Sequence, residues 1–152
     1  MNPTFKAIIL VTFFSAPAMA QTIAQQQQHK YSQDQVDSQL SFANGACGTT
    51  ITAPIEWTGF DHVDLNTAGR DNHSVAVGQY CGEPLEALNT LCHTGDPAKA
   101  AVKRNIQKVV CKYGGPGKRD VSLAAGTLTY SVDFKLGATS KMFVQSYVAN
   151  HI

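Results

Sequence analysis

The sequence lacks the short motifs that identify many enzymes and nucleotide-binding proteins. It contains no Cys-x-x-Cys pair, no His-Glu-x-x-His zinc motif and no Gly-x-Ser-x-Gly nucleophile turn. The glycine and lysine spacing of a phosphate-binding P-loop is also missing. Thiol exchange, zinc-protease chemistry and the common serine-hydrolase architecture are therefore disfavoured. A Ser–His–Asp arrangement forms without any local motif, so serine catalysis is made less favourable but stays open.

Charged residues are scarce, at 15% of the 152 residues, and the formal net charge is only +1. A nearly neutral chain is a poor general binder of nucleic acid, because such binding depends on many Lys and Arg side chains that neutralise phosphates. The content of 43% hydrophobic residues is that of a globular chain. The composition thus predicts a globular protein that does not bind nucleic acid.

No hydrophobic run is long enough to cross a membrane. The apolar stretch 7–14 is about 8 residues long, whereas a membrane-spanning helix needs about 20. It follows Lys6 and precedes Ala18-Met19-Ala20, a pattern that signal peptidase recognises. We therefore expect residues 1–20 to be a signal peptide, cleaved after Ala20, and the protein to be periplasmic or secreted. Removal of Lys6 would leave 11 basic and 11 acidic residues, and no cysteine follows the cleavage site to carry a lipid anchor.

The four cysteines are an even number, which in an exported chain predicts two disulfides. Cys81 and Cys92 bracket a predicted helix over 83–91, and a helix of that length separates its ends by about 13 Å. A disulfide needs Cα atoms within about 7 Å, so this pair is disfavoured. Of the two remaining pairings, we favour Cys47–Cys81 with Cys92–Cys111 over the alternative Cys47–Cys92 with Cys81–Cys111.

The N-terminal part of the exported chain is rich in glutamine and nearly free of large apolar groups. We interpret 21–41 as a flexible segment and 42–152 as a single domain. An alternative within the first segment is a short helix that begins at Ser32, since Ser32 and Gln35 fit a capping box and Val36 and Leu40 share a face. Pro54 restricts 51–57 to an edge strand or extended segment, with Trp57 as a core anchor.

Helices and strands are better marked in the rest of the domain. The stretch 75–80 is compatible with a short strand, Pro84 suits the first turn of the helix over 83–91, and Asp96-Pro97 marks the start of another helix with Asp96 as N-cap. β-branched residues favour a strand over 108–113.

The clearest strand is 127–134, where apolar and polar side chains alternate. A hairpin connects it to 121–123 through Ala124-Ala125-Gly126, and a C-terminal amphipathic helix follows Thr139-Ser140. The expected fold is α+β, with an antiparallel β-meander over about 108–134 packed against two or three amphipathic helices and two disulfides.

The densest cluster of reactive side chains contains two histidines and three aspartates: Asp61, His62, Asp64, Asp71 and His73. Such a group can pair His with carboxylate for acid–base catalysis, or bind a divalent metal. No metal-ligand spacing supports the second use, and Asp and Asn are also common in polar turns. These residues are candidate catalytic residues only, and we expect no metal and no cofactor.

The other histidines are weaker candidates for a functional role. His93 follows Cys92 at a predicted helix end, where a cation favours the helix dipole. We expect His29 and His151 to be inert, because the first lies in the flexible segment and the second near the chain end.

Basic residues crowd into one window of the chain, and they are the candidate binding residues: Lys99, Lys103, Arg104, Lys108, Lys112, Lys118 and Arg119. The stretch Gly114–Arg119 resembles an anion-binding loop, although a solvated strand connection explains it better. A shared basic patch would recognise an acidic protein partner or an anionic envelope polymer.

Together these features favour a small exported binding protein, of the inhibitor or immunity-factor kind, over an enzyme. One alternative is a small hydrolase that uses the Asp/His cluster at 61–73. Another is an oligomeric structural protein of the envelope, in which the sheet or the C-terminal helix forms a symmetric interface. The sequence leaves the oligomeric state open.

Overall fold

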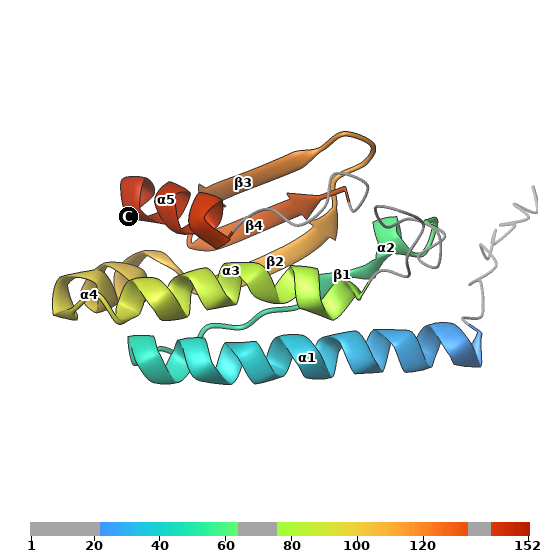
Figure 1. Cartoon of the computed structure of the whole chain (residues 1–152), viewed down its shortest axis with the longest axis horizontal. Coiled ribbons are helices and arrows are strands. Elements are labelled where there is room, and N and C mark those ends of the chain that lie inside the picture. Colours follow the sequence, from blue (N-terminus) through green and yellow to red (C-terminus); the bar gives the residue numbers. More distant parts are fainter. Residues whose placement is uncertain (1–21, 64–75, 134–140) are drawn as a thin grey trace, which may run out of the picture.

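The structure is a computed structural model that describes residues 22–63, 76–133 and 141–152. Within these ranges the chain forms five helices and a four-stranded sheet, which confirms the α+β fold class (Figure 1). The helices are α1 (Ile23–Cys47), α2 (Trp57–Phe60), α3 (Val77–Cys92), α4 (Asp96–Asn105) and α5 (Lys141–His151). The strands are β1 (Ile55–Glu56), β2 (Lys108–Tyr113), β3 (Arg119–Ala124) and β4 (Thr127–Val132).

The sheet is mixed, so the prediction of a purely antiparallel meander is wrong. The strand order is β1-β2-β4-β3, with β3 and β4 antiparallel and with β2 parallel to both β1 and β4. Strand β4 lies between β2 and β3, and its inward side chains Leu128, Tyr130 and Val132 are completely buried. An interior strand buries one face most fully, which agrees with this position. Strand β3 is mostly exposed and forms an edge.

The predicted hairpin between β3 and β4 is confirmed. Its turn residues Ala125 and Gly126 both have positive φ, at 47° and 77°, which matches the twist of two antiparallel strands. The carbonyl oxygen of Gly126 accepts hydrogen bonds from the N–H groups of Gln107 and Lys108. The turn is thereby tied to the start of β2.

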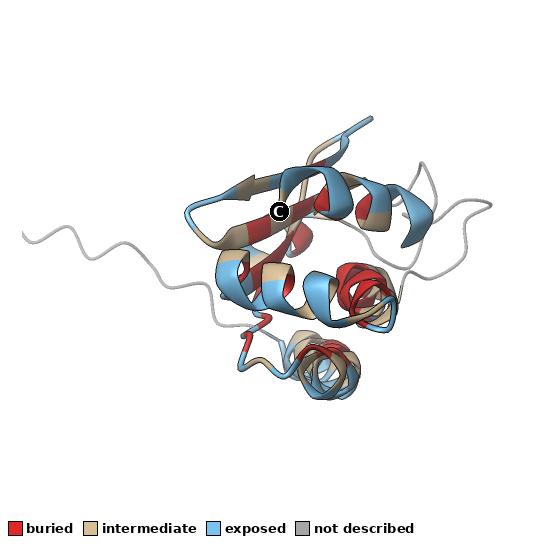
Figure 2. Cartoon of the chain, turned by 90° about the vertical axis from the view of Figure 1, so that its left-hand side faces the viewer, coloured by how far each residue is buried: buried red, intermediate tan, exposed pale blue. Residues whose placement is uncertain are grey.

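Helix α3 forms the centre of the core. Ten of its 16 residues are buried, and Figure 2 accordingly shows it largely in the colour of buried residues. The predicted helix over 83–91 is confirmed, but α3 begins at Val77, so the expected strand over 75–80 is wrong and Pro84 lies inside the helix. Val77 and Cys81, one helical turn apart, both face the core.

Helix α1 replaces most of the expected flexible segment over 21–41, and this is a correction. Thr22 caps the helix, and its hydroxyl accepts from the Gln25 N–H at 3.2 Å. A few apolar residues are enough to pack α1 on α3 because the two helices approach very closely at Gly78. A Cβ at this position would collide with the Ser32 carbonyl oxygen. Backbones in such close contact gain packing energy without large side chains.

The two disulfides are Cys47–Cys92 and Cys81–Cys111, with Cα–Cα distances of 5.1 and 5.4 Å. The favoured pairing, Cys47–Cys81 with Cys92–Cys111, is therefore wrong, although the exclusion of Cys81–Cys92 is confirmed. The physical reason is that α1 and α3 run parallel (Figure 1). Cys47 and Cys92 each end their helix, so parallel packing brings these two ends together.

The remaining elements agree with the sequence in type and position, apart from the cap of one helix. Strand β1 is an edge strand, and Trp57 is partly buried against the core. Helix α4 begins at Asp96 with Gly95, rather than Asp96, as N-cap. In α5, Val144 and Val148 are buried as their spacing predicts.

Candidate functional site

The basic residues fall into two groups at opposite ends of β2. Lys99, Lys103 and Arg104 lie on α4 and Lys108 begins β2, whereas Lys112, Lys118 and Arg119 surround the other end of the strand. Lys112 lies four positions after Lys108 along the strand, a rise of about 13 Å. The single patch expected from the sequence is thus divided by the fold.

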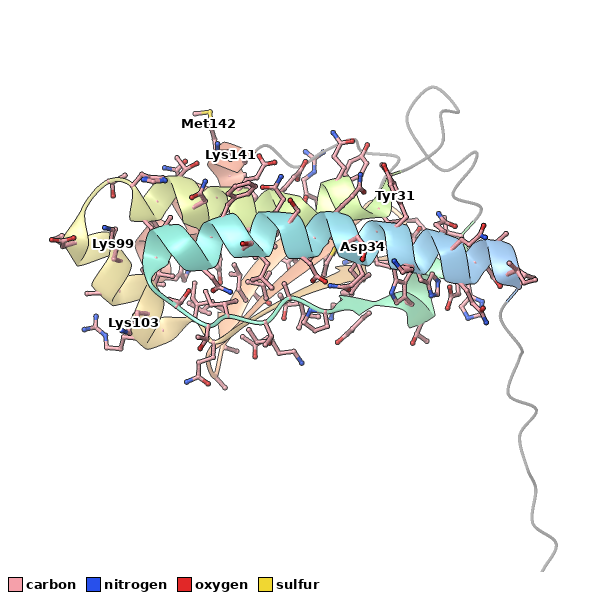
Figure 3. All side chains as sticks on the ribbon, turned by 90° about the horizontal axis from the view of Figure 1, so that it is seen from below. Tyr31, Asp34, Lys99, Lys103, Lys141 and Met142 are labelled. Carbon is pink, nitrogen blue, oxygen red and sulfur yellow. A yellow bond between two sulfur atoms is a disulfide. The ribbon has the colours of Figure 1, made fainter. Side chains whose placement is uncertain are left out.

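Three of the four cations in the first group have no acidic partner among the described residues. Lys99 lies 3.6 Å from Asp96 on the same helix. In the described part of the chain, Lys103, Arg104 and Lys108 are exposed and form no ion pair. We call these three residues the basic edge. Lys99 and Lys103 project from α4 at one end of the molecule (Figure 3).

A surface hollow of about 340 Å³ adjoins the basic edge at Lys103. Its lining comes from α4, from the link between α4 and β2, and from the segment that follows α1: Gly48, Thr49, Thr50, Ile51, Lys103, Ile106 and Gln107. The hollow therefore combines a cation with hydroxyl, amide and apolar groups. Such a mixture fits a polar side chain of a partner better than a purely apolar one.

One asparagine holds the rim of this hollow. The Oδ1 atom of Asn44 accepts from the Thr49 hydroxyl at 2.7 Å and from the Ile51 N–H at 2.9 Å, and its Nδ2 donates to the Ile51 carbonyl at 3.0 Å. Gly48 ends α1 with a φ of 65°, which favours glycine. The segment beside Lys103 is thus fixed by hydrogen bonds.

The second group lies beside two carboxylates, and one of them occupies the glycine-rich loop. Asp133 is buried and accepts from the Gly117 N–H at 2.6 Å. This N–H, which the sequence suggested for an external anion, is used within the fold. Burial raises the pKa of Tyr113, and the nearby negative charge of Asp133 raises it further.

The other carboxylate, Glu83, was not among the residues selected from the sequence. The hydroxyl of buried Tyr130 donates to its Oε2 at 2.6 Å. Burial raises the pKa of Glu83, the Tyr130 hydrogen bond opposes this, Glu86 adds to it and Arg119 counteracts it. The signal available in the sequence was the buried position of Tyr130 in the alternating strand, because a buried tyrosine hydroxyl requires a partner.

The Asp/His cluster is only partly described by the structure. Asp64, Asp71 and His73 lie outside the described residues, and His62 is exposed. Asp61 contacts His29 of α1, with 2.8 Å between Oδ1 and Nε2.

His29 is therefore part of the packed fold rather than of a flexible segment. Its ring stacks on Trp57 with 3.7 Å between centroids. His151 also has contacts, since its ring stacks on Tyr147 and its Nδ1 lies 2.7 Å from the Tyr147 carbonyl oxygen. His93 is exposed, and the neighbouring Cys92 is bound in a disulfide.

The described residues offer neither a cluster of metal ligands nor a membrane-spanning helix. They contain no group of three or more His, Cys, Asp or Glu side chains able to hold a metal ion. None of the helices in the described ranges is long and apolar enough to span a membrane.

Comparison with known proteins adds no assignment. No protein-family model matches the chain, and no curated protein or solved structure is significantly similar to it.

Proposed function

We propose that the protein is a small exported binding protein that recognises an acidic protein surface through the basic edge Lys103, Arg104 and Lys108. The observation that supports the proposal most is that these three exposed cations have no acidic partner among the described residues. A partner's carboxylates would neutralise them without first breaking an internal ion pair. An inhibitor or immunity-type factor works through such a contact.

An acidic protein fits better than an anionic polymer because the fold divides the basic residues. A polymer is best held by a continuous row of cations, whereas Lys103 lines the compact hollow beside Gly48–Ile51, and Lys108 directly follows Gln107 of the same lining. A folded partner can place one side chain in this hollow and carboxylates at its rim.

Export is part of the proposal. Two disulfides are compatible with an oxidising compartment. The stretch 1–20 that resembles a signal peptide lies outside the described residues. Sequencing the N-terminus of the mature protein from an export fraction would test this part, with Gln21 as the expected first residue.

The binding experiment compares two triple variants in capture from an envelope extract. Lys103→Glu, Arg104→Glu and Lys108→Glu reverse the basic edge. Lys30→Glu, Lys118→Glu and Lys141→Glu change the net charge equally at other sites. We expect only the first variant to lose the partner. Equal retention by both variants, or loss by both, would contradict the proposal, and retention of only polysaccharide would favour the polymer.

A small hydrolase is a second candidate, supported by the contact between His29 and Asp61. A carboxylate that orients an imidazole is a recurring part of hydrolytic sites. The candidate predicts hydrolysis of a small ester or peptide substrate, lost in His29→Ala and kept in His62→Ala. We favour binding over hydrolysis because His29 also stacks on Trp57, which gives it a role in packing α1 against α2.

A further inference from the structure

A second hollow, distinct from the basic edge, lies between α1 and α3. It measures about 240 Å³, and polar side chains line it together with one glycine: Gln35, Ser38, Gln39, Gly78, Gln79 and Glu86. Three carboxamides, a hydroxyl and a carboxylate supply both donors and acceptors. None of these lining residues is a cation, which disfavours an anionic ligand.

Two exposed aromatic rings flank the lining on α1. Tyr31 and Phe42 are 64% and 61% exposed, although large hydrophobic side chains are usually covered. They are 11 residues apart, three helical turns or about 16 Å, and therefore lie on the same face of α1 as Gln35 and Ser38. Tyr31 projects from the side of α1, at a distance from the end of the molecule that bears Lys99 and Lys103 (Figure 3).

Gln35 connects the first ring to the hollow. Its Nε2 donates to the Tyr31 hydroxyl at 3.2 Å. Its Oε1 is buried and has no hydrogen-bond partner, beside Gly78, which has no side chain. An unpaired buried acceptor is unfavourable, and a donor on a ligand would satisfy it once the amide turned into the hollow.

We propose that this hollow and its two flanking rings bind a neutral saccharide chain. Sugar rings present hydroxyl groups at their edges, which pair with carboxamides, and C–H groups on their faces, which pack on aromatic rings. An apolar protein segment is less well matched because the hollow itself is polar. The inference does not depend on the basic edge, which lies on α4 and β2.

The test is titration calorimetry of the mature protein with three probes: tetrasaccharides of N-acetylglucosamine, glucose and mannose. We expect at least one to bind saturably at millimolar concentration. Tyr31→Ala and Phe42→Ala should each weaken binding roughly tenfold, whereas Ile23→Ala, an exposed residue of α1 away from the hollow, should not. Tyr31→Phe keeps the ring and should retain most of the affinity.

Two outcomes would overturn the inference. One is no saturable binding of any of the three probes, and the other is unchanged affinity in Tyr31→Ala and Phe42→Ala. Self-association that disappears in these two variants would assign the face to a second copy of the chain instead. Gln79→Ala, on the α3 side, provides a further variant if either aromatic substitution impairs folding. The basic-edge variant should bind the saccharide normally, which separates this test from that of the proposed function.

Discussion

The hydroxyl of Tyr130, completely buried in the central strand β4, donates a 2.6 Å hydrogen bond to the carboxylate of Glu83 on α3. This bond joins the sheet to the central helix. The Cys81–Cys111 disulfide joins the same two layers two residues earlier on α3. A covalent and a polar link therefore fix α3 on the sheet.

Glu83 should make the stability of the protein depend on pH. Because its folded-state pKa lies above the ordinary value of 4.5, the folded chain holds the proton more tightly than the unfolded chain. Its contribution to stability is then present below pH 4.5 and is lost as the pH rises through the raised pKa. In Glu83→Gln, which keeps an acceptor for Tyr130 but cannot ionise, this loss should be absent.

Urea unfolding at a series of pH values measures this effect. The free energy of unfolding of Glu83→Gln, relative to the natural protein, should increase with pH across that window. Ser122→Ala, on exposed β3, removes no ionisable group, so it is the control and should show a flat difference. A flat difference for Glu83→Gln as well would contradict a raised pKa.

The close crossing of α1 and α3 predicts opposite effects at two glycines. Gly78→Ala would bring a Cβ into the Ser32 backbone and the Gln35 amide, so we expect a loss of about 2 kcal/mol or more in the free energy of unfolding. Gly45→Ala, on the same helix pair but with nothing within 4 Å of its Cβ position, should stabilise α1 by about 0.5–1 kcal/mol. Thermal unfolding compares the two, and a neutral Gly78→Ala would exclude the described helix crossing.

The disulfide pairing can be tested by cross-combination of serine substitutions. Removing either bridge, Cys47–Cys92 or Cys81–Cys111, should cost about 4 kcal/mol, because each closes a loop of 45 or 30 residues. The double variant Cys47→Ser with Cys81→Ser breaks both bridges. It should therefore be much less stable than a variant that lacks only one bridge. If that variant instead retained a Cys92–Cys111 bridge in a non-reducing digest, the described pairing would be wrong.

Substitution of His29 should show how α1 is attached to α2. Its ring covers Trp57, the only tryptophan in the chain. His29→Ala should therefore shift the fluorescence emission of Trp57 toward that of a more exposed indole and reduce stability by about 1 kcal/mol. His93→Ala, an exposed histidine at the end of α3, should leave the emission unchanged. Equal spectra for both variants would show that His29 does not stack on Trp57.

Local patterns were enough for the hairpin but not for the first helix. The alternation of Leu128, Tyr130 and Val132 predicts β4 because one face of a strand is buried. Helix α1 has no comparable pattern, since Val36 is the only large apolar residue that it buries completely. Its stability comes from close approach to Gly78 and Gly82 on another helix, which a local window does not contain.

The site features that the sequence did not predict also depend on contacts between residues that are far apart in the chain. The cysteine pairing depends on α1 and α3 being parallel, and the contact between His29 and Asp61 joins residues 32 positions apart. The seven basic residues lie close in sequence, yet β2 carries Lys108 and Lys112 apart along its length. Sequence reasoning found the elements that hold the candidate binding residues, whereas their grouping in space required the fold.

The central claim, recognition of an acidic protein through the basic edge, is tested most directly by the dissociation constant of the captured partner at low and at physiological salt. For the natural protein, affinity should fall as salt rises, because screening weakens contacts between exposed charges. For the variant Lys103→Glu, Arg104→Glu and Lys108→Glu, affinity should be at least roughly a hundredfold lower at low salt. Equal dissociation constants for the natural protein and this variant, at both salt concentrations, would contradict the claim.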